Sequence, residues 1–235
     1  MLIAAFSDCH QQRGPEDPRD DFWSEYGPFL KALGRLPDNA TIIGLGDLAD
    51  YQRLNGNINE IIEPYLLFWR MFANRKGIYL WGNHDAVVAN PKIQKLFPGG
   101  ITFAQRMIID GVYYCHGNEW DLACGRWPWI GRLVVKAANV LGKISPRLED
   151  WAEKLSKEIQ SVGRYSNHNT FDFFAREFVK NFIDVHSICC GHTHRLNSYQ
   201  FESGKYFINT GSVAYGFGES FTIIEDGIFK DVIFI

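Results

Sequence analysis

The chain has 235 residues, of which 46% are hydrophobic and 15% aromatic, and its formal net charge is -3. This composition excludes a disordered chain, and the acidic balance disfavours general binding to nucleic acid, which needs a basic surface. No apolar stretch is long enough to span a bilayer, and the first residues lack the basic segment of a signal peptide. Five cysteines without a Cys-x-x-Cys pair favour a cytoplasmic protein with reduced thiols.

Strands and helices alternate along the first half of the chain. Apolar runs predict strands at residues 2–6, 41–47 and 77–85. Helical patterns predict helices at about residues 21–36 and 58–75, the second bent at Pro64. An Asp-Gly pair at residues 110–111 predicts a hairpin between residues 102–109 and 112–116.

The second half begins with a long helical region, at about residues 119–184, and ends in strands. One strand is expected over Ser187–His194, and three more at about residues 198–202, 205–210 and 221–235. We therefore expect a mixed sheet in a layered α/β domain that spans residues 1–235 and carries a helical insert.

Short polar motifs follow the apolar strands directly. They contain five of the seven histidines: Asp8-x-His10, Gly46-Asp47-x-x-Asp50, Gly82-Asn83-His84-Asp85, His116 and Gly191-His192-x-His194. Ligand sites of α/β sheets gather at the carboxyl ends of strands. A core histidine usually occurs alone, so the joint pattern predicts a metal site. Carboxylate, imidazole and amide ligands together suit Mn²⁺, Fe or Zn²⁺ better than Ca²⁺ or a thiolate-held zinc.

Strand geometry adds two expectations about this site. Alternate residues of an extended strand project to the same side, so His192 and His194 should aim at one point. By the same alternation Cys9, Cys115 and Cys190 should point away from the site and pack as core residues.

The ordered series of motifs, from Asp8 to His194, resembles the calcineurin-like metallophosphoesterase superfamily. The segment Tyr206–Val213, "YFINTGSV", resembles the stretch that follows the last motif in many members. The resemblance implies a β-sandwich flanked by helices and a site for two divalent metal ions, of which Mn²⁺ is favoured over Fe or Zn²⁺. It divides the ligands into one set for each metal and one bridge: Asp8, His10 and His194; Asn83, His116 and His192; Asp47 as the bridge.

The resemblance also implies how such a site works. Two cations activate water and neutralise phosphoryl oxygens during in-line attack. Asn83 can bind a metal through its oxygen while its NH₂ group faces the phosphate. His84 stands beside the metals as a proton donor, with Asp85 as its orienting partner. For Asp50, a cap or loop hydrogen bond and a role in the site are both open.

The substrate is open between several phosphoesters. The stretch Tyr113–Asp121 and the following insert resemble the branch that contains UDP-2,3-diacylglucosamine diphosphatase. That resemblance implies a phosphodiester or pyrophosphate bond, on a UDP-lipid-like substrate. However, Asn118 stands where the branch often has Asp, and His84 where the diphosphatase has Arg. A small soluble phosphodiesterase or phosphomonoesterase, a nuclease, and a membrane-surface scaffold that only retains the fold are the alternatives.

The insert contains a basic, amphipathic segment. Residues 122–148 include five basic side chains and no acidic one, and Arg126 and Arg132 are the candidate substrate-binding residues among them. Such a helix suits an anionic lipid or membrane surface, which would place the protein at the inner membrane face. The alternative is an ordinary surface helix whose apolar stripe packs in the core.

Overall fold

The computed structural model describes residues 1–17, 20–51, 57–120, 178, 185–194, 196–201, 204–213 and 220–234. The chain divides into two compact units, residues 1–117 with 181–235, and residues 118–180. Nearly all of the second unit, and with it the helices expected in the insert, lies outside the described residues. The single domain with an insert therefore stays a prediction. Among the described helices, none has the length and apolar character needed to cross a membrane.

Six strands form the first sheet of the larger unit, in the order β11-β10-β1-β2-β3-β4. Their bounds are β1 Leu2–Phe6, β2 Thr41–Gly44, β3 Ile78–Leu80, β4 Thr102–Ala104, β10 Ser220–Glu225 and β11 Ile228–Phe234. Strands β1 to β4 are parallel, whereas β10 is antiparallel to β1. The predicted strands at 41–47 and 77–85 are present but end earlier, so their polar motifs lie in loops.

Five strands form the second sheet, in the order β5-β6-β7-β9-β8. Their bounds are β5 Arg106–Ile109, β6 Val112–Cys115, β7 Ser187–Cys190, β8 Leu196–Gln200 and β9 Tyr206–Thr210. Strands β6, β7 and β9 are parallel, and the hairpin of β5 and β6 turns at Asp110 and Gly111 as predicted.

The single strand expected at residues 102–109 is wrong. Residues 102–104 pair with β3 in the first sheet, whereas residues 106–109 pair with β6 in the second. The chain passes from one sheet to the other at Gln105, because each half of the segment finds its hydrogen-bond partners in a different sheet.

The helices of this unit follow the strands of the first sheet. Their bounds are α1 Asp21–Gly34, α2 Asn59–Ile62, α3 Leu66–Asn74 and α4 Pro91–Gln94, with 3₁₀ turns η1 Gly14–Glu16 and η2 Ala86–Ala89. A further 3₁₀ turn, η3 Asn118–Trp120, belongs to the second unit. The helix expected at 58–75 is interrupted at Pro64, which has no backbone N–H to donate.

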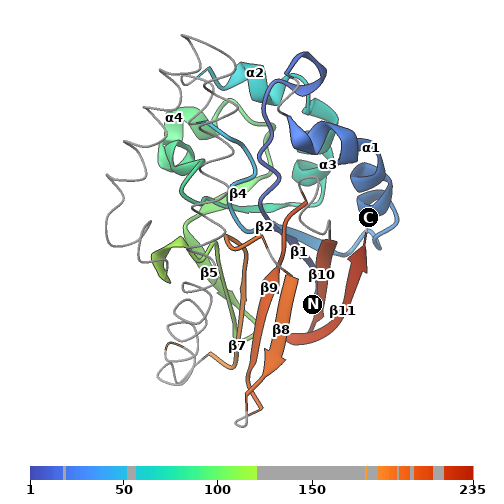
Figure 1. The fold of residues 1–235 in the computed structure, drawn as a ribbon, viewed down its shortest axis with the longest axis vertical. Helices are drawn as coiled ribbons and strands as arrows, with labels where there is room; N and C mark the ends of the chain where they lie inside the picture. The colour runs from blue at the N-terminus through green and yellow to red at the C-terminus, as the bar shows by residue number, and fades with distance from the viewer. Residues whose placement is uncertain are drawn as a thin grey trace, which may run out of the picture. The chain divides into compact units, whose positions relative to one another are not determined.

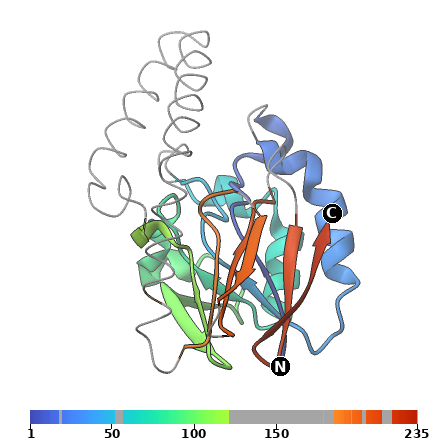
Figure 2. The ribbon, with the colours of Figure 1, turned by 60° about the horizontal axis from the view of Figure 1, so that its bottom comes forward.

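Two apolar layers hold the sheets and helices together. In β1, Ala4 and Phe6 face the helices, whereas Ile3 and Ala5 face the second sheet. The helical side contains residues of α1 and α3, and the other side contains residues of β6, β7 and β9. Figures 1 and 2 both draw the red strands β10 and β11 between the blue helix α1 and the orange strands β8 and β9. The predicted layered, mixed α/β fold is confirmed.

Aromatic side chains dominate the layer between the first sheet and the helices. The ring centroid of Phe6 lies 5.0 Å from that of Phe29, 6.1 Å from Phe68 and 6.2 Å from Phe72, all in edge-to-face arrangements. These rings are fully buried, so they fix the distance of α1 and α3 from the strand that begins the site.

Truncation of Phe68 should therefore be costly. We expect Phe68→Ala to lower the free energy of unfolding by about 3–5 kcal/mol, because the fully buried ring leaves a cavity. Urea denaturation measures the change. Leu67→Ala is the control on the same helix, since Leu67 is 57% exposed, and it should change stability by less than about 0.5 kcal/mol. Equal costs at the two positions would contradict this packing.

Candidate metal centre

The polar loops that follow the parallel strands of both sheets meet at one edge. Backbone hydrogen bonds join them: Asp8 N–H donates to the Gly46 carbonyl at 3.0 Å, His10 N–H to Asp47 at 2.9 Å, and Gly191 N–H to His116 at 3.0 Å. The first two bonds connect the loops after β1 and β2, and the third connects those after β6 and β7. The loops of the two sheets are joined by His192 N–H, which donates to Oδ2 of Asp8 at 2.9 Å across 184 positions of sequence.

Five candidate ligands have a left-handed backbone. Their φ angles are 55° at Asp8, 49° at His10, 51° at Asp47, 72° at His192 and 59° at His194. Each such non-glycine residue costs of order 1–3 kcal/mol, although aspartate and histidine tolerate the region better than most residues. Backbone strain is therefore concentrated where the polar side chains converge.

The left-handed backbone corrects one expectation. Strand β7 ends at Cys190, so His192 and His194 lie in a turn and not on an extended strand. Their imidazoles belong to two different groups of side chains.

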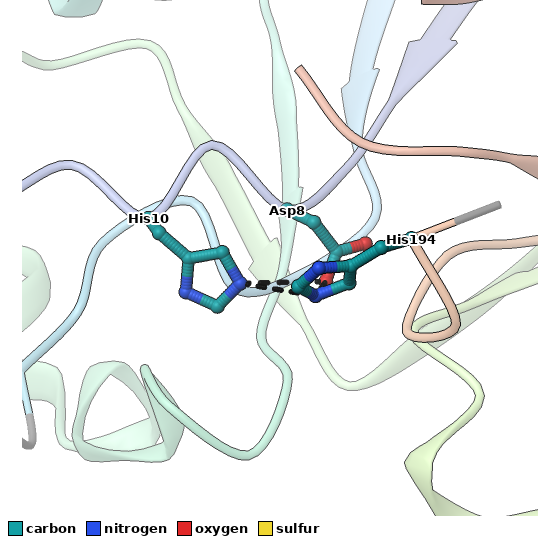
Figure 3. A group of neighbouring side chains, drawn as sticks. All are labelled: Asp8, His10 and His194. Carbon is teal, nitrogen blue, oxygen red and sulfur yellow. Dashed lines mark hydrogen bonds and ion pairs between the residues drawn. The ribbon is translucent and has the colours of Figure 1, made fainter. Parts of the chain in front are cut away.

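The first group contains Asp8, His10 and His194, whose side chains converge in Figure 3. The Oδ1 atom of Asp8 lies 3.2 Å from Nε2 of His194 and 3.7 Å from Nε2 of His10. The two Nε2 atoms are 3.3 Å apart. Burial opposes the charged carboxylate, but the imidazoles of His194 and His10 hold the pKa of Asp8 well below its usual range. Burial lowers the pKa of His10.

The second group contains Asp47, His116 and His192. Nε2 of His116 lies 3.1 Å from Oδ2 of Asp47 and 3.2 Å from Nδ1 of His192. Nδ1 of His116 donates to the Leu45 carbonyl at 2.8 Å, so Nε2 carries the lone pair in the neutral ring. Burial opposes protonation of this ring, but the neighbouring Asp47 raises the pKa of His116 to about 10.

His84 lies against both groups. Its backbone N–H donates to Oδ1 of Asp47 at 2.8 Å, and its ring packs edge-to-face on His10 at 4.9 Å. The ring atom Nδ1 lies 3.2 Å from Oδ1 of Asp50. A third possible metal-binding set, His10, Asp47 and His84, arises from this closeness.

Asp50, and not Asp85, is the carboxylate beside the His84 ring. Asp85 instead accepts hydrogen bonds from the Tyr79 hydroxyl at 2.5 Å, Gly82 N–H at 2.6 Å and Leu48 N–H at 3.0 Å. Burial and the charge of Asp47 raise the pKa of Asp85 to about 7. The orienting role expected for Asp85 is therefore wrong: this carboxylate fastens the loops after β2 and β3 together.

The remaining predicted residues have different positions. Asn83 lies in the loop after β3, between Gly82 and His84, and is partly buried, so its role as a metal ligand and phosphate contact stays a prediction. Arg126 and Arg132 lie outside the described residues. The expected burial of the cysteines is confirmed for Cys9, Cys115 and Cys190. That their thiols point away from the site stays a prediction.

Two glycines of the motifs lie where there is no space for a side chain. A Cβ atom at Gly82 would lie 2.3 Å from Oδ1 of Asp47 and 2.6 Å from Cδ2 of His116. A Cβ atom at Gly191 would lie 2.2 Å from the Ser7 hydroxyl and 2.7 Å from Oδ2 of Asp8. Close approach of backbone to the candidate ligands therefore requires glycine at both positions.

The residues present fit a metal ion. Oδ1 of Asp8 is buried and accepts no hydrogen bond, and it faces imidazole nitrogens. Imidazole nitrogens that converge on buried carboxylate oxygens repel one another unless a proton or a cation lies between them. Such a mixed donor set is typical of sites for first-row transition metals.

The comparisons with known proteins agree with this geometry. The model of the calcineurin-like phosphoesterase family matches residues 1–196, so the chain belongs to that family. It is thus a metal-dependent phosphoesterase by class. No curated protein matches the chain.

The solved structures that match the chain include three distant ones. A predicted phosphoesterase of Streptococcus pneumoniae is 15% identical with a TM-score of 0.42, and the match covers 99% of this chain and 88% of that one. Vps29 of Entamoeba histolytica complexed with Zn²⁺ is 17% identical, with a TM-score of 0.43 and coverage of 100% and 99%. A dimetal phosphatase of Danio rerio is 10% identical, with a TM-score of 0.48 and coverage of 95% and 91%.

Gly82→Ala should disturb the centre without any change in a ligand. Because the added methyl group collides with Asp47 and His116, we expect Mn²⁺ to bind about tenfold more weakly or worse, as measured by calorimetric titration. Gly99→Ala is the matched control, since nothing lies within 4 Å of a Cβ atom there. Unchanged Mn²⁺ affinity in a folded Gly82→Ala protein would contradict the packing of these side chains around a metal.

Proposed function

We propose that the protein hydrolyses a phosphodiester or pyrophosphate bond and that it uses two divalent metal ions. The observation that carries this proposal is the pair of adjacent groups, Asp8 with His10 and His194, and Asp47 with His116 and His192. One turn supplies an imidazole to each group, and this supports two neighbouring metal positions.

Asp47 is the best candidate for a bridge between the two ions. Its Oδ2 atom faces His116 in the second group, and the same residue belongs with His10 to the third possible set. A carboxylate has two oxygens, so one buried Asp can face both positions. The imidazoles that surround it keep its pKa low even though burial favours the neutral form, so Asp47 is ionised and ready to bind cations.

The chemistry follows from these positions. Bound cations would activate water for in-line attack and neutralise charge on the phosphoryl oxygens. His84 then gives a proton to the leaving oxygen, and its ring is held for this by Asp50. Asp50 is buried, with only 3% of its side chain exposed, whereas the His84 side chain is 28% exposed and accessible to a substrate.

The metal and the substrate are proposed from the ligand chemistry. Imidazole and carboxylate ligands favour Mn²⁺, Fe or Zn²⁺ over Mg²⁺, which prefers oxygen ligands alone, and Mn²⁺ is our first choice. A substrate similar to a UDP-lipid, held by Arg126 and Arg132 at an anionic surface, is the finer form of the proposal. A scaffold without activity is disfavoured, because every ligand position of the motifs carries a residue that can bind a metal.

Metal removal should abolish turnover. We expect chelated protein to be inactive on bis-p-nitrophenyl phosphate, and Mn²⁺ to restore activity better than Mg²⁺. Asp47→Ala should reduce Mn²⁺ binding at both groups, since Asp47 lies with His116 and His192 in one set of possible ligands and with His10 in another. Asp38→Ala is the control, because the Asp38 side chain is fully exposed.

The same assay defines the substrate class. Phosphomonoesters, phosphodiesters, nucleoside diphosphates and lipid-linked pyrophosphates are compared at equal Mn²⁺ concentration. Full activity after chelation would refute metal dependence. Activity on phosphomonoesters alone would refute the proposal that the protein hydrolyses a phosphodiester or pyrophosphate bond.

His84 should matter most for difficult leaving groups. We expect His84→Ala to lower turnover by about 10²–10⁴-fold on alkyl phosphodiesters, and less on p-nitrophenyl esters, whose leaving group needs little protonation. Asp50→Asn should show the same dependence on the leaving group to a smaller degree, because this change only loosens the hold on the His84 ring. Asp85→Asn, which affects loop contacts, should lower the turnover of both kinds of substrate by the same factor. Equal losses for good and poor leaving groups in His84→Ala, at unchanged metal content, would exclude His84 as a proton donor.

A further inference from the structure

The turn that carries His192 and His194 is held by a residue from a neighbouring strand. Asn209, on β9, is 1% exposed. Its side-chain NH₂ group donates to the Gly191 carbonyl at 2.7 Å and to the Thr193 hydroxyl at 2.9 Å. Its Oδ1 atom accepts from Gly211 N–H at 3.1 Å. Both ends of this amide are therefore engaged.

The orientation of the amide is fixed by its backbone partners. Gly211 N–H can only donate, and the Gly191 carbonyl can only accept, so Oδ1 must face the former and the NH₂ group the latter. A carboxylate in the same place has no hydrogens to give. Aspartate, which has the same shape, would present an oxygen to the Gly191 carbonyl.

The turn needs such support. His192 and His194 are both left-handed, with only Thr193 between them, and this conformation persists only where the surroundings determine it. Other bonds reach the turn from the two groups themselves: Gly191 N–H donates to the His116 carbonyl, and His192 N–H to Oδ2 of Asp8. Asn209 bonds to the turn from strand β9 and belongs to neither group.

We propose that Asn209 is a positioning residue that sets the turn so that His192 and His194 face separate metal positions. The inference rests on the proposed function, because it assigns a purpose to the separation of the two imidazoles. It extends that function to a residue that is not itself a ligand. Because the turn serves both groups, loss of Asn209 weakens metal binding at both, whereas loss of a singly used ligand weakens one.

The test uses the full-length Asn209→Asp protein. Calorimetric titration of the chelated protein with Mn²⁺ should show binding about 10–100-fold weaker than in wild type, at both steps. Amide hydrogen exchange of residues 192–194, followed by NMR in the metal-free protein, should be faster. Ile208→Ala is the matched control: Ile208 is the preceding residue of β9, buried in the layer between the sheets. It should lower the melting temperature but leave the Mn²⁺ affinity close to that of wild type.

Thr193→Val gives a second, milder variant in case Asn209→Asp does not fold. Thr193 is partly exposed, and its loss removes one of the two acceptors of the Asn209 NH₂ group. A smaller decrease in Mn²⁺ affinity and faster exchange in the turn are expected.

The outcomes separate this inference from the proposed function. Wild-type affinity and wild-type exchange in folded Asn209→Asp overturn the positioning role, as does an equal loss of Mn²⁺ binding in Ile208→Ala. Wild-type protein that binds none of Mn²⁺, Fe²⁺ and Zn²⁺ overturns the proposed function, and the exchange measurement still decides whether Asn209 holds the turn.

Discussion

Asp8, whose carboxylate is fully buried, joins three other segments of the site. Its backbone N–H donates to the Gly46 carbonyl after β2, its carboxylate accepts from His192 N–H after β7, and its backbone carbonyl accepts from the Ser212 hydroxyl after β9, at 2.7 Å. An ionised group without solvent is costly unless opposite charge or hydrogen bonds compensate it. The fold therefore depends on what surrounds this one carboxylate, and the same surroundings form a place for cations.

Strain and rigidity are combined in the same region. The candidate ligands occupy left-handed backbone, and glycines beside them permit contacts that any side chain would prevent. Such a conformation is maintained by the two apolar layers beneath it, which hold the strand ends at fixed distances. A centre of this kind is organised before its metal arrives, so little conformational freedom is lost on binding.

Local patterns in the sequence predicted most of the strands and the polar motifs that follow them, but not the division of residues 102–109 between two sheets. The partners of the side chains were harder to predict. Asp85 was expected beside His84 because it is adjacent in sequence, yet its carboxylate reaches back to Leu48 and Tyr79, and the ring meets Asp50 instead. The loop paths decide these pairs, and they depend on left-handed residues that no periodicity reveals. One further feature of the sequence could have pointed to the support of the turn after β7: an asparagine, Asn209, within the mainly apolar strand β9.

The order of strands in the first sheet has a consequence for how the protein is made. Strand β1 (Leu2–Phe6) lies between β2 and β10 (Ser220–Glu225), so one of its two partners is synthesised more than two hundred residues after it. Contacts of such long range form slowly and leave an open strand edge in the meantime. A nascent chain that has reached only His116 already carries Asp8, His10 and Asp47, but the imidazoles of His192 and His194 and the covering strand are still missing. During synthesis, then, the centre is one of the last features to be completed, and a ribosome-bound chain exposes a half-built sheet that chaperones would need to protect.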